Sequence, residues 1–345
     1  MIKLIDVHQA NVIGLGAKKF SNGLVDHLSN IKAIKIKKIY LNKQLSIRHG
    51  DAGSNINYVN YFFGGFSRLF EIFFWRLYRE QENELLVLGD LPLNTAVKQY
   101  VFCQQSLLFK HFPIYSFNFF KFSLFRLIFK LFLKKTDVVL VQSEEMATNI
   151  RQIINYDIDV HVIDVRSDFF GWPRFLRTKK QNLNENSENF ELIYPSAFYP
   201  HKNHYLLGLI KLAKTTKIIL TIDKKDLTSN KNLIKCIGRV TREEIYELYK
   251  KVDALLFLSS NESLGMPIIE AVKCNLPVIC PRAEYTKELG SDNCFFFDID
   301  DPSSLEQAIY LAQKKISSGW WPRWEFNKIF NSPNCITIEE AILKK

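Results

Sequence analysis

The sequence predicts an α/β protein of two domains, each built on a parallel sheet, that face each other across a cleft. Its 345 residues exceed what one hydrophobic core usually organises. Short apolar runs alternate with helical patterns in both halves, as in parallel sheets covered by helices. Residues 177–190, RTKKQNLNENSENF, are polar and lack apolar periodicity, which is typical of a linker. Ligands of such sheets bind at the carboxyl ends of the strands, where the cleft is expected.

The first domain is expected over residues 1–176. A helix is predicted over 21–31, and the apolar runs predict strands over 2–8, 84–90, 100–105 and 137–143. Gly14 and Gly16 follow the first of these strands in a predicted loop. A dinucleotide-binding fingerprint needs a third glycine at position 19, which is Lys19. The glycine loop therefore does not predict a dehydrogenase.

The second domain is expected over residues 191–318. Predicted strands cover 190–196, 216–223, 232–238, 253–260, 276–281 and 293–298. The helix over 241–252 begins with a capping box of Thr241 and Glu244, and further helices begin at Pro267 and after Asp301. Residues 319–345 form a C-terminal segment that could pack back on the first domain.

Composition limits the kinds of partner without choosing among them. The net charge is +10, and residues 1–176 carry most of it, with 22 Lys and Arg against 15 Asp and Glu. A basic domain attracts nucleic acid, phospholipid headgroups or diphosphate substrates. Six cysteines without a C-x-x-C pair indicate free thiols in a reducing cytosol. The sequence shows neither a signal peptide pattern nor 18 consecutive apolar residues, so we expect a cytoplasmic protein.

One stretch, SSNESLGMPIIEAVKCNLPVI at 259–279, places two glutamates on either side of a helix start. Pro267 suits the first helical position. The preceding amides, at Ser263, Leu264, Gly265 and Met266, would then lie at a helix N-terminus, where phosphate binds. Glu262 and Glu270 are poor phosphate ligands but good acceptors for hydroxyls. The combination suits a sugar nucleotide, although a capped helix with a solvated acid and a dipole partner would have the same sequence.

Residues 252–289, VDALLFLSSNESLGMPIIEAVKCNLPVICPRAEYTKEL, resemble the donor-binding signature of the retaining GT-B glycosyltransferases of family 4, the group 1 glycosyltransferases. That family carries Glu-x7-Glu here, usually as E-G-F-G-x-P-x-x-E, and this chain has Ser-Leu where Gly-Phe is commoner. The resemblance covers 191–312 well and the N-terminal half loosely. It implies two Rossmann-like domains, with Glu270 on the ribose hydroxyls of the donor and Glu262 facing the transferred sugar.

The same resemblance assigns further donor residues. Lys202 matches the family's lysine for the donor diphosphate, whereas the family's arginine six residues earlier is Ser196 here, so His201 or Arg239 would have to substitute. Backbone groups near Arg239 and Val240 would hold the nucleobase. The loop with Gly14 and Gly16 would face the donor phosphates, although a plain tight turn would also use these glycines.

The acceptor side is less defined. No catalytic histidine of the family type is evident in the first domain, and Gln104, Gln105 and His111, after the third strand, are the candidates to line it. The D-x-D runs at 157–159 and 298–301 resemble metal sites of other glycosyltransferases. Helix capping explains Asp301, so we predict neither a metal nor a cofactor.

Two aromatic and basic stretches, at 61–80 and 116–135, predict contact with an anionic membrane. In the second, Arg126, Lys130 and Lys134 recur every four residues among Phe and Leu, as in a helix that lies in a membrane interface. A domain helix with solvated cations is the alternative. The tryptophans in GWWPRWEF, 319–326, fit either a domain contact or a membrane anchor.

Together these features predict a retaining, metal-independent glycosyltransferase. It would take a nucleotide-sugar donor and a lipid-linked saccharide acceptor at the inner face of a bacterial cell membrane, in surface polysaccharide synthesis. A sugar-nucleotide epimerase of the same fold would need acid and base groups in the cleft. A membrane-associated adaptor would ignore nucleotide sugars. We expect no nucleic acid partner.

Overall fold

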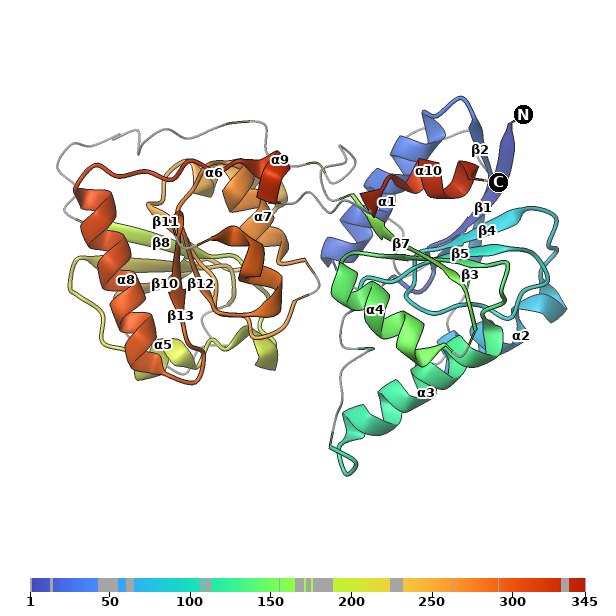
Figure 1. Ribbon diagram of the computed structural model, residues 1–345, viewed down its shortest axis with the longest axis horizontal. Helices are drawn as coiled ribbons and strands as arrows, with labels where there is room; N and C mark the ends of the chain where they lie inside the picture. Colours follow the sequence, from blue (N-terminus) through green and yellow to red (C-terminus); the bar gives the residue numbers. More distant parts are fainter. Residues whose placement is uncertain are drawn as a thin grey trace. The chain divides into compact units, whose positions relative to one another are not determined.

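The chain forms two compact units, each with its own parallel sheet (Figure 1). The computed structural model describes residues 2–12, 15–42, 55–59, 65–105, 108, 113–154, 156–164, 171, 175, 189–223, 232–262, 264–290, 292–329 and 335–344. Unit 1 comprises 1–171 with 331–345, and unit 2 comprises 172–330. The two-domain α/β prediction is therefore confirmed, whereas most of the predicted linker, at 177–188, lies outside the described residues.

Unit 1 contains an eight-stranded sheet with the order β14-β7-β6-β5-β4-β1-β2-β3. All of the strand pairs described in this sheet are parallel. The strands are β1 (Lys3–His8), β2 (Ile34–Asn42), β3 (Asn55–Val59), β4 (Glu84–Val87), β5 (Gln99–Phe102), β6 (Val138–Val141), β7 (Asp159–Ile163) and β14 (Cys335–Ile336). The helices are α1 (Leu15–Ser29), α2 (Gly65–Tyr78), α3 (Phe117–Phe132), α4 (Glu144–Ile153) and α10 (Ile338–Leu343). Strands β2, β3, β7 and β14 are additions to the elements that the sequence predicts.

The last strand and helix of unit 1 come from the far end of the sequence. Cys335 and Ile336 of β14 pair with Val162 and Ile163 of β7. Helix α10 buries Ile338, Ala341 and Ile342, and the Tyr100 hydroxyl on β5 donates to the Ile342 carbonyl at 3.2 Å. Residues 335–343 thus complete a sheet whose other strands precede residue 164.

Helices α2 and α3 lie side by side on unit 1. The rings of Phe73 and Phe132 meet edge to face with centroids 5.0 Å apart, and the Arg68 guanidinium lies 5.9 Å from the Phe125 ring. Buried side chains from both helices, Ile72, Trp75, Phe122 and Phe129, join one core cluster with residues of the sheet. Both helices therefore cover the same face of it.

Two of the three cations predicted in one helical row, Arg126 and Lys130, lie on α3, and the third, Lys134, follows the end of the helix at Phe132. The Arg126 side chain donates to the Leu108 carbonyl at 3.1 Å, and Lys134 Nζ lies 3.5 Å from the Val97 carbonyl oxygen. Lys130 is exposed. Helix α3 also exposes a row of apolar residues, Phe120, Leu124, Leu127 and Leu131. The alternative of a helix with solvated cations holds for Lys130 but not for Arg126 and Lys134, which contact backbone carbonyls.

Unit 2 contains a six-stranded parallel sheet with the order β10-β9-β8-β11-β12-β13. The strands are β8 (Phe190–Tyr194), β9 (Thr216–Leu220), β10 (Ile234–Cys236), β11 (Ala254–Leu256), β12 (Val278–Pro281) and β13 (Cys294–Phe297). The helices are η4 (Pro200–Lys202), α5 (Leu206–Leu209), α6 (Arg242–Tyr249), α7 (Met266–Lys273), η6 (Glu284–Leu289), α8 (Pro302–Ser317) and α9 (Phe326–Ile329). Each predicted strand of this half is present.

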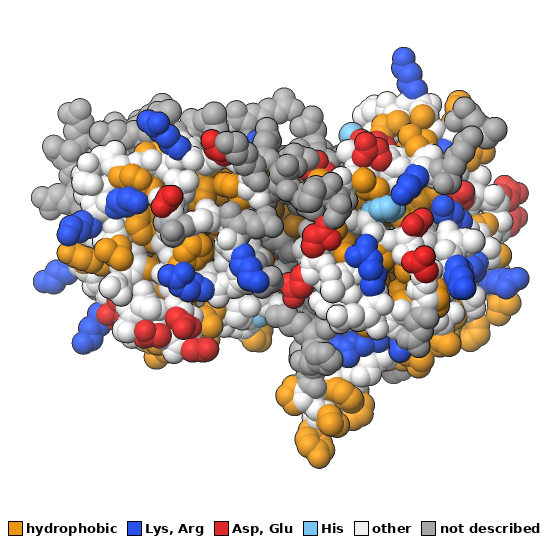
Figure 2. All heavy atoms as spheres, in the orientation of Figure 1, with side chains coloured by type: hydrophobic (Ala, Val, Ile, Leu, Met, Phe, Trp, Pro, Cys, Tyr) orange, Lys and Arg blue, Asp and Glu red, His pale blue; other side chains and the backbone are white. Residues whose placement is uncertain are grey.

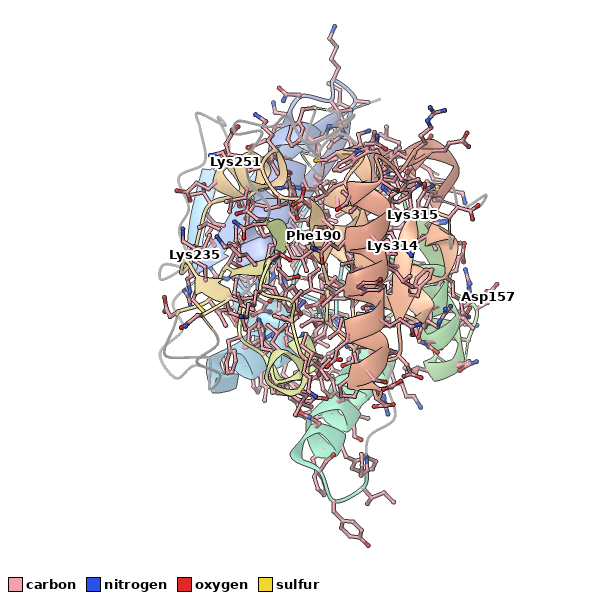
Figure 3. All side chains as sticks on the ribbon, turned by 90° about the vertical axis from the view of Figure 1, so that its left-hand side faces the viewer. Asp157, Phe190, Lys235, Lys251, Lys314 and Lys315 are labelled. Carbon is pink, nitrogen blue, oxygen red and sulfur yellow. The ribbon has the colours of Figure 1, made fainter. Side chains whose placement is uncertain are left out.

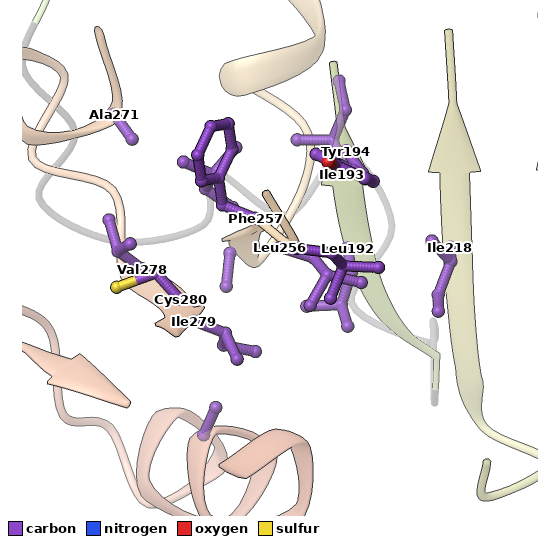
Figure 4. Close-up of a cluster of buried hydrophobic side chains, with 14 of the residues drawn as sticks. Leu192, Ile193, Tyr194, Ile218, Leu256, Phe257, Ala271, Val278, Ile279 and Cys280 are labelled. Atoms are coloured by element: carbon purple, nitrogen blue, oxygen red, sulfur yellow. The ribbon is translucent and has the colours of Figure 1, made fainter. Parts of the chain in front are cut away.

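The core of unit 2 explains why its strands read as continuous apolar runs. Strands in the middle of a parallel sheet are buried on both faces. Figure 4 shows the side chains of Leu192, Leu256, Phe257 and Ile279 clustered between the strands and the helices, and all four are inaccessible to solvent. Helix α8 turns its polar side outward, with Lys314 and Lys315 at the surface (Figure 3).

The tryptophan-rich segment at 319–326 packs on unit 2. Trp324 Nε1 donates to the Leu276 carbonyl at 2.9 Å, and the Trp320 ring contacts Phe295 edge to face at 5.5 Å. Lys315 Nζ lies 4.2 Å from the centroid of the Trp320 ring. Of the two roles that the sequence allows for these tryptophans, the contacts of Trp320 and Trp324 favour packing on a domain.

Candidate donor site in unit 2

The start of α7 has the geometry that its sequence requires. Gly265 caps the helix with φ 63° and ψ 51°, a left-handed conformation that favours glycine. A Cβ added there would lie 3.3 Å from the Tyr285 ring. Pro267 occupies the second helical position rather than the predicted first, because the helix begins at Met266. Leu264 and Met266 are partly exposed, and Ser263 lies outside the described residues.

Lys202 and Glu262 form an ion pair at this site. Lys202 Nζ contacts Glu262 Oε1, and their side chains are 14% and 15% exposed. Lys202 ends η4, and its Nζ lies 5.5 Å from the centroid of the Phe257 ring. The sequence assigns both residues to the donor but does not predict that they meet. In this pairing each side chain compensates the charge of the other.

Hydrogen bonds fasten the Lys202 loop to the loop that carries Glu262. The His201 carbonyl accepts from the Ser260 amide at 2.9 Å and from Ser259 Oγ at 3.2 Å. Asn203, with φ 50°, donates from Nδ2 to the Leu258 carbonyl at 2.9 Å. The two loops follow β8 and β11, which are neighbours in the sheet. The carboxyl ends of adjacent parallel strands thus bring Lys202 and Glu262 together.

Glu270 lies one turn into α7, as predicted, but it is buried among side chains of α6. Its Oε1 accepts from Arg242 Nε at 3.0 Å and lies 3.5 Å from the Tyr246 hydroxyl. Its Oε2 accepts from the Tyr249 hydroxyl at 3.2 Å. Burial raises the pKa of the Glu270 carboxyl, and the nearby Arg242 charge opposes that rise. The sequence did not identify these three partners.

The segment before α6 contains the residues that the family resemblance assigns to the nucleobase. Gly238 has φ 76°, and its amide donates to the Ile222 carbonyl at 3.1 Å. Arg239 is exposed and Val240 is partly exposed. Thr241 then begins α6 with the predicted capping box, in which Thr241 and Glu244 each bond the backbone amide of the other.

Ser196, the departure from the family's arginine, has a histidine partner. Ser196 Oγ lies 2.9 Å from His204 Nε2, and the Ser196 amide donates to Thr221 Oγ1 at 3.0 Å. His204 is buried against Tyr194, with ring centroids 5.0 Å apart. His204 was not singled out from the sequence. Its spacing of eight residues from Ser196 gives no periodic signal for a contact across a loop.

The predicted residues of the first domain lie in unit 1. The amides of Gln104 and Gln105 donate to Asp90 Oδ1 at 2.6 Å and 3.2 Å, which holds the chain after β5 against the turn after β4. Burial raises the pKa of Asp90, and the Gln104 amide bond opposes the rise. Gly16 lies in the first turn of α1 rather than in a loop, because the helix begins at Leu15. Gly14 and His111 lie outside the described residues.

The two acidic runs that resemble metal sites lie at the start of a helix and at the start of a strand. Asp301 caps α8, with its Oδ1 2.9 Å from the Ser303 amide, as predicted. Asp159 begins β7 in unit 1 and Asp157 precedes it. Within the described part of the chain, His, Cys, Asp and Glu side chains form no cluster of three or more that could hold a metal ion.

Curated relatives of the chain act in O-antigen synthesis. It is 26% identical over 197 residues to the O-antigen chain mannosyltransferase RfbU of Salmonella typhimurium, which covers 54% of this chain and 53% of that protein. It is 25% identical over 183 residues to the O-antigen biosynthesis glycosyltransferase WclY of Escherichia coli, covering 44% of this chain and 51% of that protein. The chain thus spans about half the length of these relatives.

Solved structures share the fold of both units. Sucrose-phosphate synthase of Thermosynechococcus elongatus aligns over 99% of this chain and 97% of its own, with a TM-score of 0.68 and 12% identity. Anabaena HepE in complex with UDP and glucose aligns over 96% and 97%, with a TM-score of 0.60 and 14% identity. Residues 177–315 match the family model of the glycosyl transferases group 1. The chain therefore has the GT-B fold, and its residues 177–315 are similar to the group 1 glycosyltransferases.

Proposed function

We propose that the chain is a retaining, metal-independent glycosyltransferase. It moves a sugar from a nucleotide-sugar donor to a lipid-linked saccharide in bacterial surface polysaccharide synthesis. The observation that carries the proposal is the grouping in unit 2 of the Lys202–Glu262 pair, the Gly265 cap and Glu270. The relatives in O-antigen synthesis support the pathway.

Each part of this group has a role that its chemistry suits. Lys202, the amides at the start of α7 and the helix dipole would stabilise the negative charge of the departing diphosphate. Glu262 would accept hydroxyls of the transferred sugar, and Glu270 those of the ribose. A bound donor would give Lys202 and Glu262 new partners, so that the ion pair is exchanged for contacts with phosphate and sugar.

A thermal shift screen tests this function. UDP-, GDP- and ADP-sugars are added singly to the full chain, and at least one should raise the melting temperature, since ligand binding to the native state stabilises it. A chain that none of them stabilises would not be a nucleotide-sugar enzyme. The stabilising donor is then incubated alone. Slow hydrolysis agrees with a transferase, whereas rapid conversion of the donor without acceptor would indicate an epimerase.

The proposed acceptor places the protein at the inner face of the cell membrane, and α2 and α3 supply a surface for it. More than half of the exposed large hydrophobic side chains among the described residues lie between Phe70 and Leu131. Phe70, Phe74 and Leu77 form an exposed row on α2, and a second exposed row on α3 begins at Phe120 and ends at Leu131. Figure 2 shows hydrophobic side chains gathered at the projecting end of α3.

The charges around these rows suit an anionic membrane. Helix α3 contains no acidic residue, and Glu71, the acid in α2, is buried. Arg76, Lys121 and Lys130 are exposed. Apolar rows bordered by cations bind interfaces through buried apolar area and attraction to anionic lipid. None of the described helices is both long and apolar enough to cross a membrane.

Replacing Phe120, Leu124 and Leu127 together by serine should weaken vesicle binding about tenfold or more, because each removed side chain contributes apolar area. Binding is measured by co-sedimentation with vesicles of phosphatidylcholine and phosphatidylglycerol. The matched control replaces Tyr310 and Leu311, which are exposed on α8 in unit 2. Equal binding by the triple variant and the unmodified chain would exclude this surface.

A further inference from the structure

We infer that Arg242 is a positioning residue, which holds Glu270 as an ionised acceptor for the ribose hydroxyls of a nucleotide. The inference rests on the proposed function and assigns a role to a side chain outside the donor signature. Arg242 lies on α6, whereas Glu270 lies on α7, and the contact between them is the Nε–Oε1 hydrogen bond of 3.0 Å.

Glu270 is buried, and the ionised form of a buried carboxyl is disfavoured unless a charged partner lies beside it. Its residue is 8% exposed, and moving a carboxylate out of water without a charged partner is costly. The guanidinium of Arg242 supplies that partner, and its side chain is itself only 22% exposed. A charge-assisted hydrogen bond of this kind is stronger than a neutral one.

Among the described residues, the side chains that donate to the Glu270 carboxylate come from one face of α6. Arg242, Tyr246 and Tyr249 recur at intervals of four and three residues, which aligns them along a helix. Arg242 and Tyr249 bind opposite oxygens and so fix the plane of the carboxylate. The Tyr246 hydroxyl, at 3.5 Å, is the weakest of the three contacts and the one that a ribose hydroxyl could most easily replace.

This arrangement also ties two parts of the proposed nucleotide site together. Helix α6 begins directly after the segment with Gly238, Arg239 and Val240, where the nucleobase is expected. A shift of α6 would therefore move the nucleobase segment and the orientation of Glu270 at the same time. Arg242 would couple recognition of the base to recognition of the ribose.

The titratable groups around Glu270 determine the expected pH dependence. They are Arg242, Tyr246 and Tyr249 on α6, with Cys274 at the end of α7 close to both tyrosines. Burial raises the pKa of Glu270 and Arg242 opposes the rise, so removing Arg242 raises that pKa further. The protonated fraction of Glu270 then grows as the pH falls. Nucleotide binding should therefore suffer more at pH 6 than at pH 8.

The test uses the full chain with UDP and GDP, and with their 2′,3′-dideoxy forms, in calorimetric titrations at pH 6 and pH 8. Arg242→Met should weaken binding of the ribose nucleotide about tenfold or more, with the larger loss at pH 6. It should leave the dideoxy forms almost unaffected, because they lack the hydroxyls that Glu270 would bind. A merely structural role would weaken both forms alike. Lys250→Met, an equal loss of charge at the end of α6, is the control.

A second variant distinguishes a loss of ribose recognition from misfolding, because removing one partner of a buried pair can destabilise the fold. Arg242→Met with Glu270→Gln leaves no unpaired charge, and it should bind the ribose and dideoxy forms with nearly equal affinity. If Arg242→Met binds UDP and GDP as the unmodified chain does at both pH values, the inference is wrong and the proposed function stands. If the unmodified chain binds neither nucleotide and none of the nucleotide sugars stabilises it, the proposed function fails as well.

Discussion

Lys202→Met is expected to lower turnover of the donor about 100-fold or more, since a positioned charge on a developing anion commonly contributes that much. Lys202 Nζ lies beside Glu262 at the end of η4, with 14% of its side chain exposed, so water compensates little for its loss. The measurement is release of nucleoside diphosphate from the donor that the thermal shift screen identifies, with bacterial lipid extract as the source of acceptor.

Two further variants separate chemistry from folding in this experiment. Lys202→Met leaves Glu262 without its ion-pair partner, so comparing the melting temperatures of Lys202→Met and of its double variant with Glu262→Gln shows whether an unpaired carboxylate destabilises the fold. Lys214→Met removes an exposed cation from the same unit and should leave turnover unchanged. A Lys202→Met protein that melts normally and keeps the turnover of the unmodified chain would remove Lys202 from the mechanism.

Phe257→Ala is expected to destabilise unit 2 by about 3–5 kcal/mol, the usual cost of deleting a buried aromatic ring. Phe257 is inaccessible to solvent and contacts the Tyr194 and Tyr285 rings, with centroids 5.7 Å and 6.2 Å away. The same ring lies beneath Lys202 Nζ. Its loss should therefore weaken both the fold and the placement of the cation.

Urea unfolding followed by tryptophan fluorescence measures this effect. Four of the five tryptophans, at 172, 320, 321 and 324, belong to unit 2, so the signal reports mainly on that unit. Phe257→Leu keeps most of the volume and should cost less than about 1.5 kcal/mol. Equal unfolding midpoints for the alanine variant and the unmodified chain would show that this ring contributes little.

The sequence predicts the parts of the donor site that depend on local signals. Thr241 and Glu244 are three residues apart and lie in the same helical turn, so the sequence alone predicts their capping box. The α7 helix follows from Gly265 and Pro267 for the same reason, with an error of one residue at its start. The resemblance to a family added the expected roles of Lys202 at the donor diphosphate and of Glu262 at the transferred sugar, which no local rule supplies.

Contacts between elements could not be predicted in the same way. Arg242 reaches Glu270 only because α6 and α7 pack together in unit 2, and no spacing within either helix specifies that packing. The three cations predicted in one helical row, at 126, 130 and 134, show a second limit of prediction from sequence. Helix α3 ends at Phe132, before Lys134. Contacts of Arg126 and Lys134 with the carbonyls of Leu108 and Val97 leave Lys130 as the exposed cation of the three.

The completion of the unit 1 sheet by β14 has a consequence for synthesis on the ribosome. Strand β7 is translated more than 170 residues before its neighbour β14, and all of unit 2 emerges in between. Domains generally fold as units when their chain is available. Unit 2 can therefore finish first, while the edge of β7 and the site for α10 wait exposed until residues 335–343 leave the exit tunnel. The first unit to be translated is the last to be completed.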